Sequence, residues 1–345
     1  MPEKILVTGG FGFIGSHLVE ALLQDQNTKV HVVDNLSSNP LPLNYLLEEI
    51  GEQSRLSYSI CSIQEFCKSP QTNVDFSEIY HLASVVGPAG VLPHSGKIIK
   101  KIVDDTYNLI DLALKCGARL LDVSTSEVYG GGQEGFCSET MSKIIPSTYS
   151  TRLEYAMGKL AAEVALTNMT KVSSLQVVII RPFNVSGPRQ SGAGGFVLPR
   201  FIVQALENQN LTIFGDGNQI RAFTNVKDIV NGIILAIHKG RSGQVYNLGN
   251  PNNRCTINEL ADAVIRITGS KGGKIHVDPK TIYGPLYEAA NDKFPDARKA
   301  MDELGWHPIY SLDETIQQTV NYFRQLPPSI RKCLSGKSDW RNKIA

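Results

Sequence analysis

Residues 8–15 read Thr-Gly-Gly-Phe-Gly-Phe-Ile-Gly, directly after an apolar run at 5–7 and directly before a helical pattern. This order predicts a tight turn between a strand and a helix, of the kind that binds a dinucleotide. Gly9 lets the chain leave the strand sharply, and Gly12 lets backbone N–H groups approach a pyrophosphate. Gly15 is expected to let the helix pack against the sheet.

A second apolar run supplies the acidic residue that such a turn requires. Residues 30–33 read Val-His-Val-Val and end in Asp34, roughly 20 residues after the last glycine of the turn. A carboxylate at this place accepts hydrogen bonds from an adenosine ribose, and it repels a 2′-phosphate. Because no arginine lies beside Asp34, the sequence favours NAD over NADP.

The composition excludes several classes of protein. The 345 residues carry 34 basic and 33 acidic side chains, so no basic surface for nucleic acid or an anionic membrane is expected. No apolar stretch approaches the roughly 20 residues needed to span a bilayer. The first strand begins at Lys4, which leaves no room for a signal peptide, and the six cysteines form no C-x-x-C pair. We therefore expect reduced thiols, no metal site and a cytoplasmic location.

Strand and helix patterns alternate along the first half of the chain. Further apolar runs lie at 56–60, 79–83, 120–124 and 175–181, and helical patterns lie near 13–24, 97–116 and 150–170. This alternation predicts an α/β fold with a Rossmann-type, doubly wound parallel sheet. From Pro182 onward the elements shorten, which predicts a smaller C-terminal α/β substrate-binding lobe with a hairpin turn at 215–218. Residues 225–248 read as a helix and a strand that return to the first sheet.

Two further motifs carry chemistry. Tyr155 and Lys159 are four residues apart, so they share one face of a helix, and the ammonium could lower the pKa of the phenol. Such pairs also occur by chance on ordinary helices. Residues 124–130 read Ser-Thr-Ser-Glu-Val-Tyr-Gly after an apolar strand, where Ser and Thr also serve as caps. Its hydroxyls could share a proton with Tyr155, and Glu127 would place a carboxylate beside the substrate.

The chain resembles the extended short-chain dehydrogenases/reductases of the nucleotide-sugar epimerase, dehydratase and decarboxylase group, over about residues 3–326. The motifs are TGGFGFIGSHL, VVDNLSS, HLAS, STSEVYG, YAMGK, RPFNVSGPRQ, GDGNQIRAFTNVKDIV, VYNLGNP and LGWHP. The resemblance implies that Thr125, Tyr155 and Lys159 are the catalytic trio, with Ser126 and Glu127 beside them. It also implies that NAD is reduced and then reoxidised while a sugar hydroxyl, usually at C4, passes through a keto state.

The resemblance further assigns binding residues. NAD is expected to contact Gly9, Gly12, Phe13, Ile14, Gly15, Asp34, Asn35, Ser62, Leu82, Ala83, Tyr155 and Lys159. Ser62 stands where the family usually has an aspartate at the adenine, so weaker retention of NAD is expected. Asn184, Arg189 and Arg221 are the candidates for the nucleotide half of the substrate, with UDP as the default nucleotide, and Phe214 could line the base pocket.

The residues beside Thr125 separate the members of this group. The pair Ser126-Glu127 is the arrangement seen in UDP-glucuronate decarboxylases, and the stretches 283–287 and 293–296 resemble UDP-apiose/xylose synthases. Lys293 stands where those enzymes place an arginine for the substrate carboxylate, and lysine offers a point charge in place of a planar fork. A UDP-hexuronate decarboxylase-like enzyme is therefore expected. A 4-epimerase, a 4,6- or 5,6-dehydratase, a keto-sugar reductase disfavoured by Asp34, or a non-catalytic NAD-binding scaffold are the alternatives.

The resemblance also divides the chain. Residues 1–181 with 222–250 are expected to form the NAD-binding Rossmann domain, and 182–221 with 251–326 the nucleotide-sugar-binding domain. Residues 327–345 are expected to form a polar, poorly ordered tail. The helical patterns at 97–116 and 150–170 match the helices that pair family members into homodimers, so a homodimer is expected.

Overall fold

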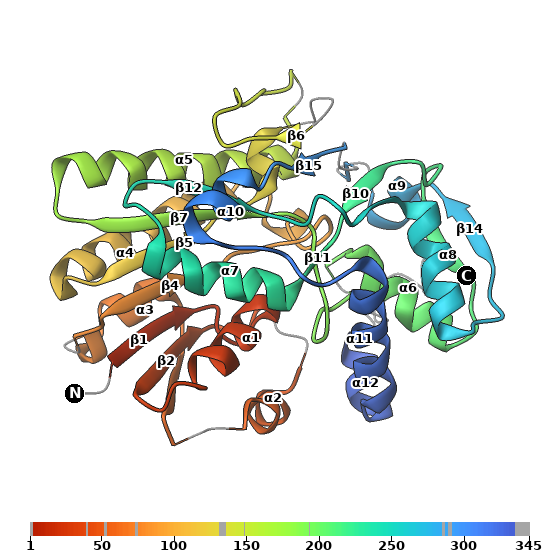
Figure 1. The fold of residues 1–345 in the computed structure, drawn as a ribbon, viewed down its shortest axis with the longest axis horizontal. Coiled ribbons are helices and arrows are strands. Elements are labelled where there is room, and N and C mark those ends of the chain that lie inside the picture. The colour runs from red at the N-terminus through yellow and green to blue at the C-terminus, as the bar shows by residue number, and fades with distance from the viewer. Residues whose placement is uncertain are drawn as a thin grey trace.

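The computed structural model describes residues 3–38, 41–51, 54–72, 75–130, 136–147, 149–192, 194–284, 287–288 and 292–334. Its centre is a sheet of seven parallel strands in the order β12-β7-β5-β4-β1-β2-β3 (Figure 1). The strands are β1 (Glu3–Thr8), β2 (Thr28–Asp34), β3 (Leu56–Ile60), β4 (Glu78–His81), β5 (Arg119–Val123), β7 (Gln176–Pro182) and β12 (Val245–Leu248). All six ladders are parallel, which confirms the predicted doubly wound sheet.

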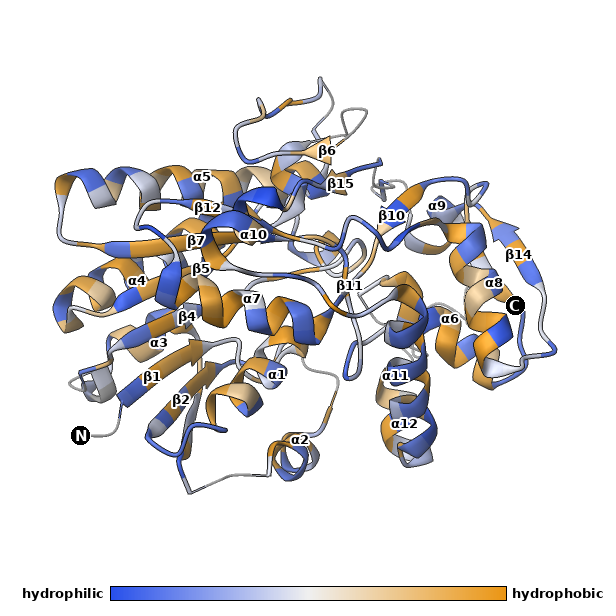
Figure 2. Cartoon of the chain, in the orientation of Figure 1, coloured by the Kyte–Doolittle hydropathy of each residue, from blue (hydrophilic) through white to orange (hydrophobic). Residues whose placement is uncertain are grey.

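Helices cover both faces of this sheet. One face packs against α1 (Phe13–Leu22) and α7 (Val226–Lys239), with α2 (Leu43–Ile50) beside them, and the other against α3 (Ile63–Cys67), α4 (Ile98–Cys116) and α5 (Thr151–Val172). Successive strand residues point to opposite faces, so Leu6 and Val7 of β1 are buried in two different hydrophobic cores. Figure 2 shows the resulting hydrophobic strands between half-polar helices. Burial on both faces explains why these strands read as continuous apolar runs.

Most of the remaining elements lie beyond the carboxyl ends of the strands, whereas α10 (Arg298–Leu304) packs against α7 and β12 (Figure 1). The other helices are α6 (Val197–Leu206), α8 (Ile257–Thr268), α9 (Pro279–Tyr283), α11 (Leu312–Gln325) and α12 (Pro328–Leu334). The remaining strands form two-stranded pairs: β9 (Leu211–Phe214) with β14 (Lys274–Val277), β10 (Ile220–Ala222) with β13 (Arg254–Thr256), β11 (Thr224–Asn225) with β8 (Val185–Ser186), and β15 (Phe294–Pro295) with β6 (Phe136–Cys137). One hydrophobic core runs through the sheet and these elements, from Val7 to Phe201 and Leu260. The domain limits given above stay a prediction.

Two local predictions need correction. Gly215 and Gly217 adopt positive φ, yet the turn at 215–218 does not join a hairpin. The strand before it, β9, pairs in parallel with β14, and the strand after it, β10, pairs with β13. The expected polar tail begins with the helix α12, whose Leu334 carbonyl accepts a hydrogen bond from Gly192 N, and residues 335–345 lie outside the described residues.

The return of the chain to the first sheet is confirmed. After β11 the helix α7 packs against β7 and β5, and β12 then pairs in parallel with β7. Within the described ranges, no helix has the length and apolar character needed to cross a membrane. The strand order reverses around β1, between β2 and β4, and a crevice at such a switch point is where open α/β sheets bind ligands.

Candidate active site

The glycine turn forms a cradle at the switch point. Gly9 has φ +72°, and a Cβ there would lie 2.6 Å from Ala83 N. A Cβ on Gly15 would lie 2.1 Å from Gly9 O, so this glycine lets α1 approach the turn that follows β1, and its role in packing on the sheet stays a prediction. Gly12 precedes α1, whose first N–H groups have no side-chain cap, and a Cβ there would approach only Gly9 O. The cradle fits a pyrophosphate.

The carboxylate of Asp34 closes this cradle. It accepts hydrogen bonds from Phe11 N at 3.0 Å and from Leu36 N at 2.8 Å, and the residue is 9% exposed. Burial raises the pKa of Asp34, and these two N–H groups oppose the shift. The two bonds orient the carboxylate at the end of β2 and leave it lone pairs for ribose hydroxyls. The glycine turn after β1 and Asp34 at the end of β2 therefore fit NAD.

The other predicted NAD contacts divide into two groups. Phe13 and Ile14 begin α1 beside the turn, and Leu82 and Ala83 follow β4 against Gly9, so these four lie at the cradle. Asn35 Oδ1 accepts a hydrogen bond from Ser37 N. The Ser62 side chain already makes hydrogen bonds as the cap of α3: its hydroxyl donates to Glu65 Oε2 at 2.7 Å and accepts from Glu65 N. A contact of Ser62 with adenine stays a prediction.

The reactive residues come from the end of β5 and from α5. Thr125 caps the 3-10 helix η3 (Ser126–Tyr129) by accepting a hydrogen bond from Glu127 N at 3.2 Å. The Thr125 side chain lies at the Tyr155 hydroxyl, where it opposes the rise in the pKa of Tyr155, so Thr125 and Tyr155 are brought together. Ser84, which follows β4, also lies at the Tyr155 hydroxyl, but its geometry falls short of a hydrogen bond and its buried Oγ is left without a partner.

The expected lowering of the Tyr155 pKa by Lys159 is not found. Burial raises the pKa of Tyr155 well above its usual value, and the charges of Glu127 and Asp122 raise it further. Lys159 is 1% exposed and its Nζ donates to Val123 O at 2.8 Å. The shared helix face was predicted correctly, but the ammonium is turned to the end of β5.

Glu127 lies at the centre of a cluster of charges. Its Oε1 is 2.6 Å from Lys293 Nζ, and its Oε2 is 2.6 Å from Arg152 Nη2. Burial opposes ionisation of Glu127, but Lys293 and Arg152 outweigh it and lower its pKa to about 2. Burial lowers the pKa of Lys293 to about 8 although Glu127 opposes this shift. A backbone bridge between Arg221 and Lys293 brings the segment after residue 291 to this place.

The predicted substrate residues are not all at this cluster. Arg221 is buried beside it and forms an ion pair with Asp292 at 3.3 Å. Asn184 has φ +37° and donates to Ala222 O, next to Arg221. Arg189 instead pairs with Glu20 at 2.9 Å and Glu49 at 2.8 Å, on α1 and α2. These partners offer no support for a diphosphate contact of Arg189.

An aromatic cluster borders the same region. Tyr283 and Tyr287 stack with ring centroids 5.1 Å apart, and both present edges to Phe214. Arg200 places its guanidinium 3.9 Å from the centre of the Phe214 ring. Burial raises the pKa of Tyr287, and the charges of Arg152 and Arg221 oppose this rise. The aromatic rings therefore lie beside the cationic cluster. Of the stretch 283–287 singled out in the sequence, residues 285 and 286 lie outside the described residues.

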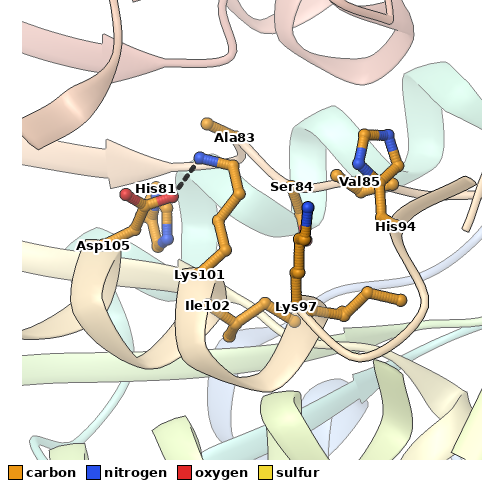
Figure 3. Close-up of a pocket in the computed structure, with 10 residues that line it drawn as sticks. His81, Ala83, Ser84, Val85, His94, Lys97, Lys101, Ile102 and Asp105 are labelled. Carbon is orange, nitrogen blue, oxygen red and sulfur yellow. Dashed lines mark hydrogen bonds and ion pairs between the residues drawn. The ribbon is translucent and has the colours of Figure 1, made fainter. Parts of the chain in front are cut away.

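A cavity of about 150 Å³ lies behind the loop that follows β4 (Figure 3). Its lining comes from that loop and from α4 with the turn before it: His81, Ala83, Ser84, Val85, His94, Lys97, Ile98, Lys101, Ile102 and Asp105. Lys101 and Asp105, one turn apart on α4, form an ion pair of 3.1 Å at its wall. The cavity is large enough for several waters, and Ser84, whose buried Oγ has no hydrogen-bond partner among the described residues, is part of its lining.

Sequence reasoning missed two residues of the site. Arg152 precedes Tyr155 by three positions, which places both on one face of α5, and this spacing was available as a signal. Ser84 is the last residue of the quoted motif HLAS and follows a strand end. Both were open to prediction from position alone.

Known proteins resemble the chain along most of its length. The model of the NAD dependent epimerase/dehydratase family matches residues 5–249. UDP-glucuronic acid decarboxylase 1 of Xenopus tropicalis is 34% identical over 326 residues, which cover 94% of this chain and 72% of that protein. UDP-N-acetyl-alpha-D-glucosaminuronate decarboxylase of Bacillus cytotoxicus is 32% identical over 94% of this chain and 99% of its own. The crystal structure of UDP-glucuronic acid 4-epimerase from Bacillus cereus, with UDP-glucuronic acid and NAD, superposes with a TM-score of 0.82 at 28% identity. The superposition covers 94% of this chain and 100% of the epimerase chain.

Proposed function

Because this chain belongs to the NAD dependent epimerase/dehydratase family, we propose that it is a UDP-hexuronate decarboxylase-like enzyme that oxidises the sugar at C4. The charge balance around Glu127 carries this proposal. Arg152 and Lys293 supply two positive charges against the one carboxylate, and Arg221 is already balanced by Asp292. The excess of one positive charge suits a sugar that brings a carboxylate of its own.

Each residue has a distinct part in the oxidation. The glycine turn and Asp34 would hold NAD, which would supply an acceptor for the hydride of the sugar carbon. Tyr155 takes the proton of the C4 hydroxyl, and Thr125, whose side chain lies at the Tyr155 hydroxyl, orients both groups. Lys159 follows Tyr155 by one turn of α5, and its ammonium would stabilise the phenolate once it leaves Val123 O. Because burial raises the pKa of Tyr155, the phenolate needs a positive charge beside it to form near neutral pH.

The carboxylate of the sugar then lies β to the new ketone, which favours its loss as carbon dioxide. Arg152 and Lys293 hold and orient this group, while the ionised Glu127 keeps the two cations in place. Glu127 has a pKa of about 2, so in this arrangement it serves as a base or counter-ion and does not donate a proton. Ser126 follows Thr125 and is buried beside the same centre.

The nucleotide is assigned to the second lobe. Arg221 suits a diphosphate because its planar guanidinium matches two phosphate oxygens, and Asn184 lies next to it. The rings of Phe214, Tyr283 and Tyr287 offer a stacking surface for the base. UDP is the nucleotide named in both relatives described above.

The direct test is incubation of the purified protein with NAD and a set of UDP-sugars, with NADH absorbance and product mass followed together. Loss of carbon dioxide from UDP-glucuronate or UDP-galacturonate supports the proposal. An acidic product of unchanged mass would identify a 4-epimerase, an alternative favoured by the solved structure that holds UDP-glucuronic acid. Reaction of neutral UDP-sugars alone would contradict the binding of a carboxylate.

We further propose a cytoplasmic homodimer that pairs through α4 and α5. These helices pack together along one edge of the protein (Figure 1). Ile99 and Tyr107 of α4 and Val164 of α5 expose apolar side chains, being 41%, 48% and 54% accessible. An apolar face on paired helices favours association. Light scattering of the wild-type protein and of Tyr107→Glu tests the dimer, which the added charge should split.

A further inference from the structure

The helix α12 ends against the loop that precedes α6. Its last residue, Leu334, is fully buried in the main hydrophobic core. The Leu334 carbonyl accepts hydrogen bonds from Gly192 N at 2.9 Å and from Ser191 Oγ at 3.4 Å. The last carbonyls of a helix have no partner within the helix, so donors from outside satisfy them. The end of α12 and the loop at 191–192 therefore hold each other in place.

The same loop continues the hydrogen bonding to a second loop, which follows β4. Gly195 N donates to Gly192 O at 3.1 Å, and Ala89 N donates to Gly194 O at 3.1 Å. Gly194 O and Gly195 N belong to one peptide group, so the two bonds share a rigid plane. A path of main-chain hydrogen bonds thus leads from α12 to the loop after β4.

The loop after β4 packs beside Tyr155. Val91 is buried in the same small hydrophobic cluster as Tyr155, and Val85 packs against this cluster. Between the two valines, Gly87 has φ +94°, and a Cβ there would lie 2.6 Å from Gly194 O. A contact this close cannot change on one side without displacing the other. The position of Gly194 therefore limits where the loop beside Tyr155 can lie.

Packing and hydrogen bonds hold α12 itself. A helix of seven residues is not stable alone, so α12 depends on contacts with the rest of the protein. Ile330 and Leu334 pack into the main core. Arg331 Nη2 donates to Arg324 O at 3.1 Å and to Leu326 O at 3.2 Å, which fastens α12 to the end of α11. Loss of these contacts should loosen the loop at 191–192.

We infer that α12 is a positioning element for the active site: through the peptide groups of Gly192 and Gly194 it fixes the loop that packs beside Tyr155. This inference rests on the proposed role of Tyr155 as the base. A base must stay within hydrogen-bond reach of the sugar hydroxyl, so a mobile loop beside Tyr155 should lower kcat. The glycine turn at 9–15 makes none of the contacts in this path, so the affinity for NAD should be unchanged.

The test compares two matched leucines in the full-length protein with NAD bound. Leu334 and Leu304 each end a seven-residue helix, α12 and α10, and both are buried in the main core. Leu334→Ala and Leu304→Ala should lower the melting temperature alike, because each leaves a cavity in that core. Only Leu334→Ala should speed amide hydrogen exchange at Ala89 and Val91, by about tenfold, and lower kcat by a similar factor. Leu334→Ile keeps the side-chain volume and should restore both.

Hydrogen exchange needs no sugar, so it separates this inference from the proposed function. Faster exchange at Ala89 in Leu334→Ala supports the role of α12 even if no UDP-hexuronate reacts. Equal exchange at Ala89 in the two alanine variants would overturn the inference, as would a wild-type kcat in Leu334→Ala. Arg331→Ala removes the bonds to the end of α11 and leaves the core side chains of α12 in place. It should speed the same exchange, and it replaces Leu334→Ala if that protein does not fold.

Discussion

Lys293 places its ammonium 2.6 Å from Oε1 of Glu127, and the lysine is only 2% exposed. The two residues belong to segments far apart in the sequence, and the segment of Lys293 is held at the site by its bridge to Arg221 and by the pairing of β15 with β6. Arg152 pairs with the other oxygen of the same carboxylate. A substrate carboxylate that enters this cluster would meet two cations already oriented by Glu127.

Replacement of Lys293 should therefore change substrate choice more than overall activity. Lys293→Ala should raise KM for a UDP-hexuronate by roughly 10- to 150-fold, because a charge-assisted hydrogen bond of about 1.5–3 kcal/mol is lost. KM for a neutral UDP-sugar should change much less. Lys293→Arg keeps the charge and should retain the preference. Equal losses for acidic and neutral sugars would refute a role in binding the carboxylate.

The same lysine predicts a dependence of binding on pH. Because the pKa of Lys293 is lowered to about 8, its charge is present below that pH and is lost as the pH rises through it. KM for a UDP-hexuronate should then rise above about pH 8, approaching tenfold per pH unit for a single proton. Lys293→Arg should abolish this limb, since arginine stays charged. A wild-type limb that persists in Lys293→Arg would have to come from another group.

Glu127→Gln separates the first chemical step from the later one. The amide keeps the size of the side chain but removes the charge that holds Arg152 and Lys293. Hydride transfer should continue while loss of carbon dioxide is slowed, so NADH should accumulate on the enzyme. Stopped-flow NADH absorbance measures the first step, and product mass the second. Glu303→Gln, at an ion pair on α10, is the control and should behave like wild type. Normal turnover in Glu127→Gln would leave Glu127 a purely structural role.

Local sequence signals identified most of the fold because they coincide with what the sheet buries. Leu6 and Val7 belong to different cores, so the run at 5–7 is apolar throughout and marks a strand covered on both faces. The prediction of a hairpin at 215–218 was wrong because strand pairing there is not determined locally. The glycines of this stretch do form a turn, but the pairing of β9 with β14 is decided between segments distant in the sequence. Turn residues carry no information about that partner.

The site shows the same division. The spacing of Tyr155 and Lys159 gave their common helix face correctly, while the pKa of Tyr155 depends on burial and on the charges of Glu127 and Asp122. Asp34 was predicted from its distance to the glycine turn, and its bond to Phe11 N fits that prediction. The contact of Lys293 with Glu127 depends on tertiary packing, which no local spacing encodes.

The glycine turn provides a test of the NAD cradle. Gly9 and Gly269 have nearly the same φ, +72° and +70°, but a Cβ on Gly9 would meet Ala83 N at 2.6 Å whereas a Cβ on Gly269 would meet nothing within 4 Å. Gly269→Ala should thus cost only about 1–2 kcal/mol of stability, for the left-handed backbone alone. Gly9→Ala should in addition push apart the ends of β1 and β4 and weaken NAD binding at least tenfold. Calorimetric titration with NAD measures this, and equal NAD affinity in the two variants would contradict the cradle.

Tyr155→Phe tests the proposed base without disturbing the cofactor. The hydroxyl is lost, while the ring that packs with Val91, Ile98 and Ile102 remains. We expect turnover to fall by at least about 10²- to 10⁴-fold, the usual contribution of a positioned base, with NAD affinity unchanged. Tyr310→Phe, whose ring lies outside the site, is the control for loss of a tyrosine hydroxyl. Because the Thr125 side chain lies at the Tyr155 hydroxyl, we expect the two residues to act together, and a Thr125→Val change on top of Tyr155→Phe should add little further loss. Full activity in Tyr155→Phe would require a different base and would remove the mechanism proposed above.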